Sequence, residues 1–183
     1  MGASTAQDPT PEFALAFREL MLQVLGDEMR TTCRVLSAIP DDTHHYRPNQ
    51  KSRSAWELAW HIAADVWFLE GIAEHHFQPN PDSSNPNPCK TGAELADWYA
   101  HRYREALEKI RAMTPEQLIA PVTLGGVATE AHVSFPAFLY LMLGHLHTVH
   151  HRGQLSAYLR PMGAKVPSIY GASADEPWRG RRS

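Results

Sequence analysis

The stretch SFPAFLYLMLGHLHTVHHRGQLSAYLR, residues 134–160, decides the expected fold. Its apolar residues cover much of a helical circumference, and Pro161 and Gly163 follow to end the helix. A helix that is apolar on several sides is normally packed on several sides. We therefore expect a central helix over residues 134–160, with other helices around it.

Three more helical patterns precede this stretch, and each has its own start signal. They open at Thr10, Ser54 and Thr91, residue types that favour the N-cap position. The last two openings are predicted capping boxes, with Glu57 and Glu94 three residues further on. The expected helices span residues 10–39, 54–77 and 91–110.

The connections complete an all-α, four-helix-bundle prediction. Residues 79–88 hold four prolines and three asparagines, so we expect no helix or central strand there, only a long crossover between the second and third helices. A short helical turn is expected at 114–117 and an irregular segment or small hairpin at 119–133. The chain beyond residue 164 is expected to wrap back over the bundle. We expect one domain over residues 1–183, with flexible tails at 1–9 and about 172–183.

Composition excludes several classes of protein. The formal net charge is −3 and no basic stripe is present, so we expect no nucleic-acid partner. No apolar run is long enough to span a membrane, and no signal peptide is visible, which predicts a cytoplasmic protein with no membrane partner. Cys33 and Cys89 form no C-x-x-C pair, so a disulfide framework or a thiolate zinc site is not expected.

Histidines carry the candidate chemistry. His145, His147, His150 and His151 fall within seven residues of the last helix. His147 and His151 are four residues apart, so their imidazoles lie on one helical face and can share a metal ion. His147 and His150, three residues apart, could do the same, and the spacing leaves that choice open. His145 points away from both pairs.

A third ligand could come from the second helix. His61 lies on its apolar face, beside Leu58 and Ile62. A lone histidine in such a place is more often structural than a ligand. It would, however, complete a three-histidine site built from facing helices, as helical bundles commonly build metal sites.

The chain resembles the DinB/YfiT-like family of metal-dependent four-helix-bundle enzymes. The residues that carry the resemblance are 54–65 (SAWELAWHIAAD) and 147–155 (HTVHHRGQL), followed by 158–163 and 166–171. The resemblance implies an up-down-down-up bundle, and a divalent metal held by His61, His147 and His151 rather than His150. It also implies nickel or zinc as the metal, frequent homodimers, and in some relatives a low-molecular-weight thiol such as bacillithiol or mycothiol as cosubstrate.

Four polar residues lie close to these histidines along the chain and could support the site, with the Asp65 carboxylate able to accept the second N–H of a ligand imidazole. They are Asp65, Arg152, Gln154 and Tyr158. Surface polarity or a subunit contact would explain the same residues.

Two functions follow from such a site. Three protein ligands and an open fourth position are typical of catalytic zinc. We therefore expect a metal-dependent transferase that uses a thiol, or a hydrolase, acting on a small molecule that the sequence does not identify. The alternative is a non-enzymatic metal-binding or stress-response protein.

Overall fold

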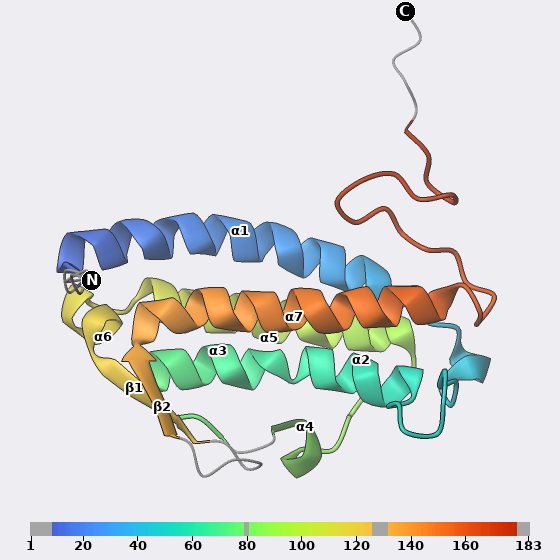
Figure 1. Cartoon of the computed structure of the whole chain (residues 1–183), viewed down its shortest axis with the longest axis horizontal. Coiled ribbons are helices and arrows are strands. Elements are labelled where there is room, and N and C mark those ends of the chain that lie inside the picture. Colours follow the sequence, from blue (N-terminus) through green and yellow to red (C-terminus); the bar gives the residue numbers. More distant parts are fainter. Residues whose placement is uncertain (1–8, 79–80, 126–131, 179–183) are drawn as a thin grey trace, which may run out of the picture.

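Long helices lie side by side in the computed structural model, which describes residues 9–78, 81–125 and 132–178 (Figure 1). The bundle consists of α1 (Pro11–Ser37), the consecutive helices α2 (Ala55–Ala63) and α3 (Asp65–Glu74), α5 (Gly92–Arg111) and α7 (Ala137–Leu159). The connections hold a 3-10 turn (Asp41–Thr43), α4 (Pro81–Ser84), α6 (Pro115–Ile119) and the strands β1 (Pro121–Gly125) and β2 (His132–Pro136). The predicted all-α bundle is confirmed.

The order of directions is up-down-down-up. Helices α1 and α7 run one way, whereas α2–α3 and α5 run the other way (Figure 1). Because α3 and α5 are parallel, the chain between them has to return along the bundle, and α4 lies on that crossover. Helix α1 packs against α5 and α7, and α3 packs against the same two helices.

The predicted N-caps Thr10, Ser54 and Thr91 are confirmed, with one difference in detail. Ser54 accepts a hydrogen bond from the Glu57 amide at 3.2 Å, and the Glu57 carboxylate accepts one from the Ser54 amide at 2.7 Å. The Thr91 hydroxyl likewise accepts from the amide of Glu94. The Glu94 carboxylate, however, accepts from the amide of Lys90 rather than that of Thr91, so the second capping box is incomplete.

The second predicted helix is interrupted at Ala64. The Trp67 amide donates to the Ala64 carbonyl at 3.1 Å, a three-residue spacing that tightens the backbone and separates α2 from α3. Helix α3 ends at Glu74, where His75 adopts a left-handed conformation with φ of 54°. The interruption falls between His61 and Asp65, so the two residues belong to different helices.

Two other boundaries differ from the prediction. Helix α7 begins at Ala137 instead of residue 134, because Ser134 and Phe135 pair with Thr123 and Val122 in the hairpin. The crossover was predicted to hold no helix, but Pro81–Ser84 form one helical turn. A proline is tolerated there because the first residue of a helix has no amide partner to lose.

Helix α7 packs on several sides but leaves one apolar face exposed. Its inner residues, such as Phe138 and Leu141, are fully buried, and Gly144 lets the ring of Phe68 approach closely. Met142, Leu143 and Leu146 are nevertheless 38–55% exposed. The helix thus packs on several sides, as expected, against α1, α2, α3 and α6, while its outer face is apolar and exposed.

The C-terminal segment packs back on α1, as expected. Arg34 donates to the Ser168 carbonyl at 2.9 Å and pairs with Glu176. Residues 172–178 were expected to be a flexible tail, but Asp175 binds Arg160 and the amide of Val166. The other predicted tail residues, 1–8 and 179–183, lie outside the described part. Among the described residues, no helix has the length and apolar character needed to cross a bilayer.

Candidate metal centre

The structure brings His61 of α2 together with His147 and His151 of α7. The ring centroid of His61 lies 5.0 Å from that of His147 and 4.5 Å from that of His151. The ring centroids of His147 and His151 are 4.5 Å apart. One ligand nitrogen from each ring falls within 4.8 Å of the others. The spacing expected on α7 thus places two imidazoles opposite a third from a facing helix.

The other histidines of the cluster lie outside this group. His150 is exposed and contacts the side-chain nitrogen of Gln154 at 3.1 Å. Between the two alternatives that spacing left open, the geometry favours His151. His145 is also separate from the three-histidine group among the described residues.

Asp82 holds the ring of His61. Its Oδ2 lies 2.9 Å from His61 Nδ1. Asp82 belongs to α4, and the Trp60 indole N–H anchors that turn by donating to the carbonyls of Asp82 and Asn85. Sequence reasoning missed Asp82, because a carboxylate on a proline-rich crossover shows no periodic relation to the histidines. The one available signal was that this crossover has to pass along the bundle.

Asp65 holds the ring of His147. Its Oδ1 lies 3.1 Å from His147 Nδ1, and Oδ2 accepts a hydrogen bond from the Thr148 hydroxyl at 2.5 Å. We expected Asp65 beside His61, four residues earlier on one continuous helix. The interruption at Ala64 separates them, and the carboxylate bonds to α7 instead.

Gln154 holds the third ring, since its Oε1 lies 2.9 Å from His151 Nδ1. A carboxylate or amide oxygen can only accept, so Nδ1 carries the hydrogen in all three rings. The lone pair of each ring then lies on Nε2. Metal-ligating imidazoles are commonly held in this way by a partner on the second nitrogen. The three side chains therefore fit a divalent metal.

The protonation of the three rings differs. Burial lowers the pKa of His61, and the charge of Arg53 lowers it further. Burial also lowers the pKa of His151. The hydrogen bond to Asp65 raises the pKa of His147 above its usual value, because the carboxylate stabilises the imidazolium. Two of the three rings thus favour the neutral form that binds metal.

Arg152 does not join the site, contrary to expectation. Its guanidinium is 1% exposed and pairs with Glu28 on α1 at 2.5 Å. It also donates to the hydroxyls of Thr32 at 3.2 Å and Tyr170 at 2.6 Å. Arg152 follows His151 by one residue, about 100° around the helix. It therefore points into the core, where it ties α7 to α1 and to the C-terminal segment.

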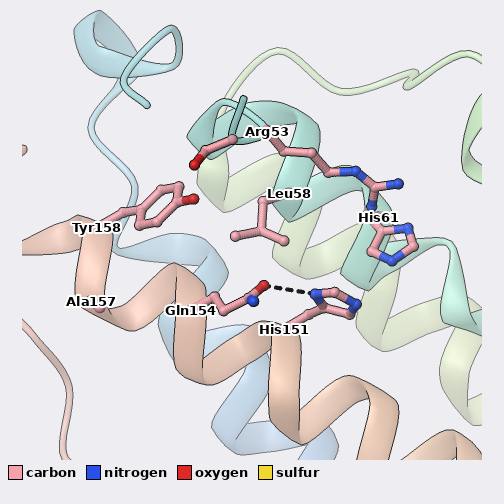
Figure 2. Close-up of a pocket in the computed structure, with 8 residues that line it drawn as sticks. Arg53, Leu58, His61, His151, Gln154, Ala157 and Tyr158 are labelled. Carbon is pink, nitrogen blue, oxygen red and sulfur yellow. Dashed lines mark hydrogen bonds between the residues drawn. The ribbon is translucent and has the colours of Figure 1, made fainter. Parts of the chain in front are cut away.

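A cavity of about 560 Å³ opens beside the cluster. Figure 2 shows Tyr158, Gln154 and His151 along α7, facing Arg53, Leu58 and His61. The ring of Tyr158 packs edge-on against Tyr46 at 5.6 Å. Tyr158 is thus a wall of the cavity and no direct partner of a histidine. The cavity is large enough for a small molecule to reach His61 and His151.

Neither cysteine is suited to act as a nucleophile. Burial raises the pKa of Cys33 to about 11, and burial also raises the pKa of Cys89. Both therefore stay protonated near neutral pH, as inert thiols do. A reacting thiol would have to come from outside the chain.

The chain is similar to a known family and to two curated proteins. The model of the DinB family matches residues 9–180. The uncharacterized protein YrdA of Bacillus subtilis is 25% identical over 150 residues, which cover 81% of this chain and 85% of YrdA. The uncharacterized protein YjoA of the same organism is 30% identical over 133 residues, or 72% of this chain and 82% of YjoA.

Two crystal structures share the fold. The DinB-like protein YjoA from Bacillus subtilis superposes with a TM-score of 0.63 and 23% identity, covering 82% of this chain and 97% of that one. A DinB-like protein from Bacillus cereus superposes with a TM-score of 0.68 and 23% identity, covering 83% of this chain and 97% of that one.

In the metal-free protein we expect His147 to titrate above the usual histidine pKa, and His61 and His151 below it. Asp65 stabilises the charged form of His147, whereas burial opposes charge on the other two rings. NMR of the imidazole resonances from about pH 5 to 8 measures all three midpoints. Asp65→Asn should lower the midpoint of His147 and change that of His61 less. An unchanged His147 midpoint in this variant would contradict the assigned hydrogen bond.

Proposed function

Since the chain belongs to the DinB family, we propose that it binds one divalent metal ion, nickel or zinc, through His61, His147 and His151. We further propose that the ion acts in a thiol-dependent transfer reaction or a hydrolysis. The observation that carries the first proposal is that each imidazole has its Nδ1 held by a separate side chain and that one ring nitrogen from each histidine lies within 4.8 Å of the others.

The donor set supports a catalytic ion over a purely structural one. Structural zinc is normally enclosed by four protein ligands, whereas catalytic zinc keeps three and an open position. The three histidines have no fourth ligand within their group among the described residues, and the cavity opens beside two of them. Bound here, the ion would supply a Lewis acid that lowers the pKa of a neighbouring water or thiol.

The chain's own residues prepare the site in defined ways. Asp65 and Asp82 hold two of the rings and, at 13% and 15% exposed, bring two negative charges close to the ion's position. Leu58 and Ala157 give the cavity apolar walls, which reduce the water around a bound molecule. The molecule would lie between α2 and α7, where Arg53 and Tyr158 also line the cavity (Figure 2).

We expect purified protein to contain one divalent ion per chain and His61→Ala, His147→Ala and His151→Ala to lose it. Loss of a supporting group alone weakens metal binding about 10–100-fold, so loss of a ligand should weaken it more. Elemental analysis measures the metal content. His145→Ala and His150→Ala are matched controls from the same helix and should retain the metal. Unchanged metal content in His147→Ala and His151→Ala would show that the site is wrong.

We expect the metal-loaded protein to join a bacillithiol-like thiol to an electrophilic substrate, which chromatography of the product measures. Chelation should abolish conversion, and added zinc or nickel should restore it. Cys33→Ser and Cys89→Ser should remain active, because both thiols are protonated near neutral pH. Conversion of the electrophilic substrate that persists without metal would contradict the thiol-transfer proposal. Metal binding without conversion would instead favour a metal-binding or stress-response protein.

The outer face of α7 supports the proposal of a homodimer. Seven of the large exposed apolar side chains lie on three neighbouring elements: Phe13 and Leu20 on α1, Val133 and Phe135 on β2, and Met142, Leu143 and Leu146 on α7. Phe13 of α1 packs against Phe138 of α7, and β2 also contacts α7, so both elements adjoin that helix. Monomeric proteins rarely expose large apolar surfaces, so a surface of this kind favours an interaction site.

We expect light scattering to give the mass of a dimer and Leu146→Glu to give that of a monomer. Leu146 is 55% exposed, so a charge there should disturb an interface without unfolding the chain. Trp178→Glu, at an exposed position of the C-terminal segment, is the matched control and should leave the mass unchanged. A monomeric wild-type protein would contradict the proposal.

A further inference from the structure

Arg53 stands at the cavity next to the candidate ligand His61. Its Nη2 lies 3.4 Å from Asp82 Oδ2, the same oxygen that lies 2.9 Å from His61 Nδ1. The guanidinium and the imidazole are therefore immediate neighbours, as Figure 2 also shows. The side chain of Arg53 is 46% exposed and lines the cavity. It can therefore meet a molecule that approaches the ion.

With a divalent ion bound at the three histidines, Arg53 would lack a full counter-charge. The carboxylates of Asp65 and Asp82 together match the charge of one divalent ion on three neutral imidazoles. Asp82 contacts both the neutral ring of His61 and the guanidinium of Arg53 through the same oxygen, Oδ2. With the ion bound, the guanidinium thus adds a net positive charge to the cavity wall. Such a wall favours an anionic ligand.

The shape of the group points to one kind of anion. A guanidinium presents five N–H donors in a planar fork, and its pair with Asp82 engages Nη2. A fork of this kind binds planar carboxylates with two hydrogen bonds. Across the cavity, Gln154 and Tyr158 add polar groups, while Leu58 and Ala157 supply apolar contacts. These groups suit a small molecule with a charged end and a short apolar stem.

We propose that Arg53 binds a carboxylate of the small molecule that reacts at the metal, and so selects for anionic ligands. The inference rests on the proposed three-histidine metal site and adds the chemical class of its ligand. A purely structural role, in which Arg53 only holds α4 through Asp82, would make no distinction between charged and neutral ligands.

The test compares thiols that end in a carboxylate with thiols of the same carbon number that end in a hydroxyl. Isothermal titration of the zinc-loaded protein gives the Kd for 3-mercaptopropionate and 3-mercapto-1-propanol, and for mercaptoacetate and 2-mercaptoethanol. We expect the carboxylate member of at least one pair to bind at least about tenfold more tightly, as a hydrogen-bonded charge pair predicts. Arg53→Met should remove this preference while the neutral thiols bind as before. Arg53→Lys keeps the charge without the fork and should retain part of the preference.

Arg47→Met is the matched control. Arg47 lies in the same loop, pairs with Glu57 at 3.3 Å and does not line the cavity. This variant should keep the full preference for carboxylates.

Propionate added after saturation with 2-mercaptoethanol tests whether the carboxylate belongs to a second substrate. If propionate binds to the wild-type protein and Arg53→Met abolishes this binding, Arg53 has the same role toward a second substrate.

The outcomes separate the two proposals. Wild-type protein that takes up neither zinc nor nickel overturns the proposed function, and this inference with it. Zinc-loaded protein without any preference for carboxylates, in either thiol pair or toward propionate, overturns only the role of Arg53. A preference for carboxylates that survives in Arg53→Met also overturns the role of Arg53. Equal weakening of charged and neutral thiols in that variant would show a structural role instead.

Discussion

Hydrogen bonds from Asp82, Asp65 and Gln154 to the three imidazoles are the interaction on which the candidate site depends. Imidazoles packed at centroid distances of 4.5–5.0 Å need polar partners, because a half-buried ring nitrogen without a partner costs free energy. Each side-chain oxygen accepts from Nδ1 and so fixes the tautomer and the orientation of its ring. The same contacts bring two carboxylates next to the three-histidine group.

The topology of the bundle places these partners. In an up-down-down-up arrangement the chain between α3 and α5 has to travel back along the bundle, and this path carries α4 past α2. Trp60 binds that turn through two carbonyls, so Asp82 reaches both His61 and Arg53. The crossover is thus a structural part of the site. It links the candidate ligand His61 to the wall of the cavity.

Different faces of helix α7 have different roles. One face supplies His147 and His151, and another buries Arg152 with Glu28, Thr32 and Tyr170, which anchors the C-terminal segment on α1. The outer face exposes Met142, Leu143 and Leu146. This division explains why the helix is apolar over most of its circumference although part of it faces outward. A sequence pattern cannot separate a buried apolar face from one that is exposed.

The sequence alone determined what depends on neighbours along the chain. Helix starts such as Ser54 with Glu57, helix ends and the i,i+4 pairing of His147 and His151 follow from local geometry. Tertiary structure decided the rest. The interruption at Ala64 sends Asp65 to His147 rather than His61, the crossover brings in Asp82, and the rotation of α7 directs Arg152 into the core. Contacts between helices depend on how each helix is rotated and where it bends, and spacing along one chain contains neither quantity.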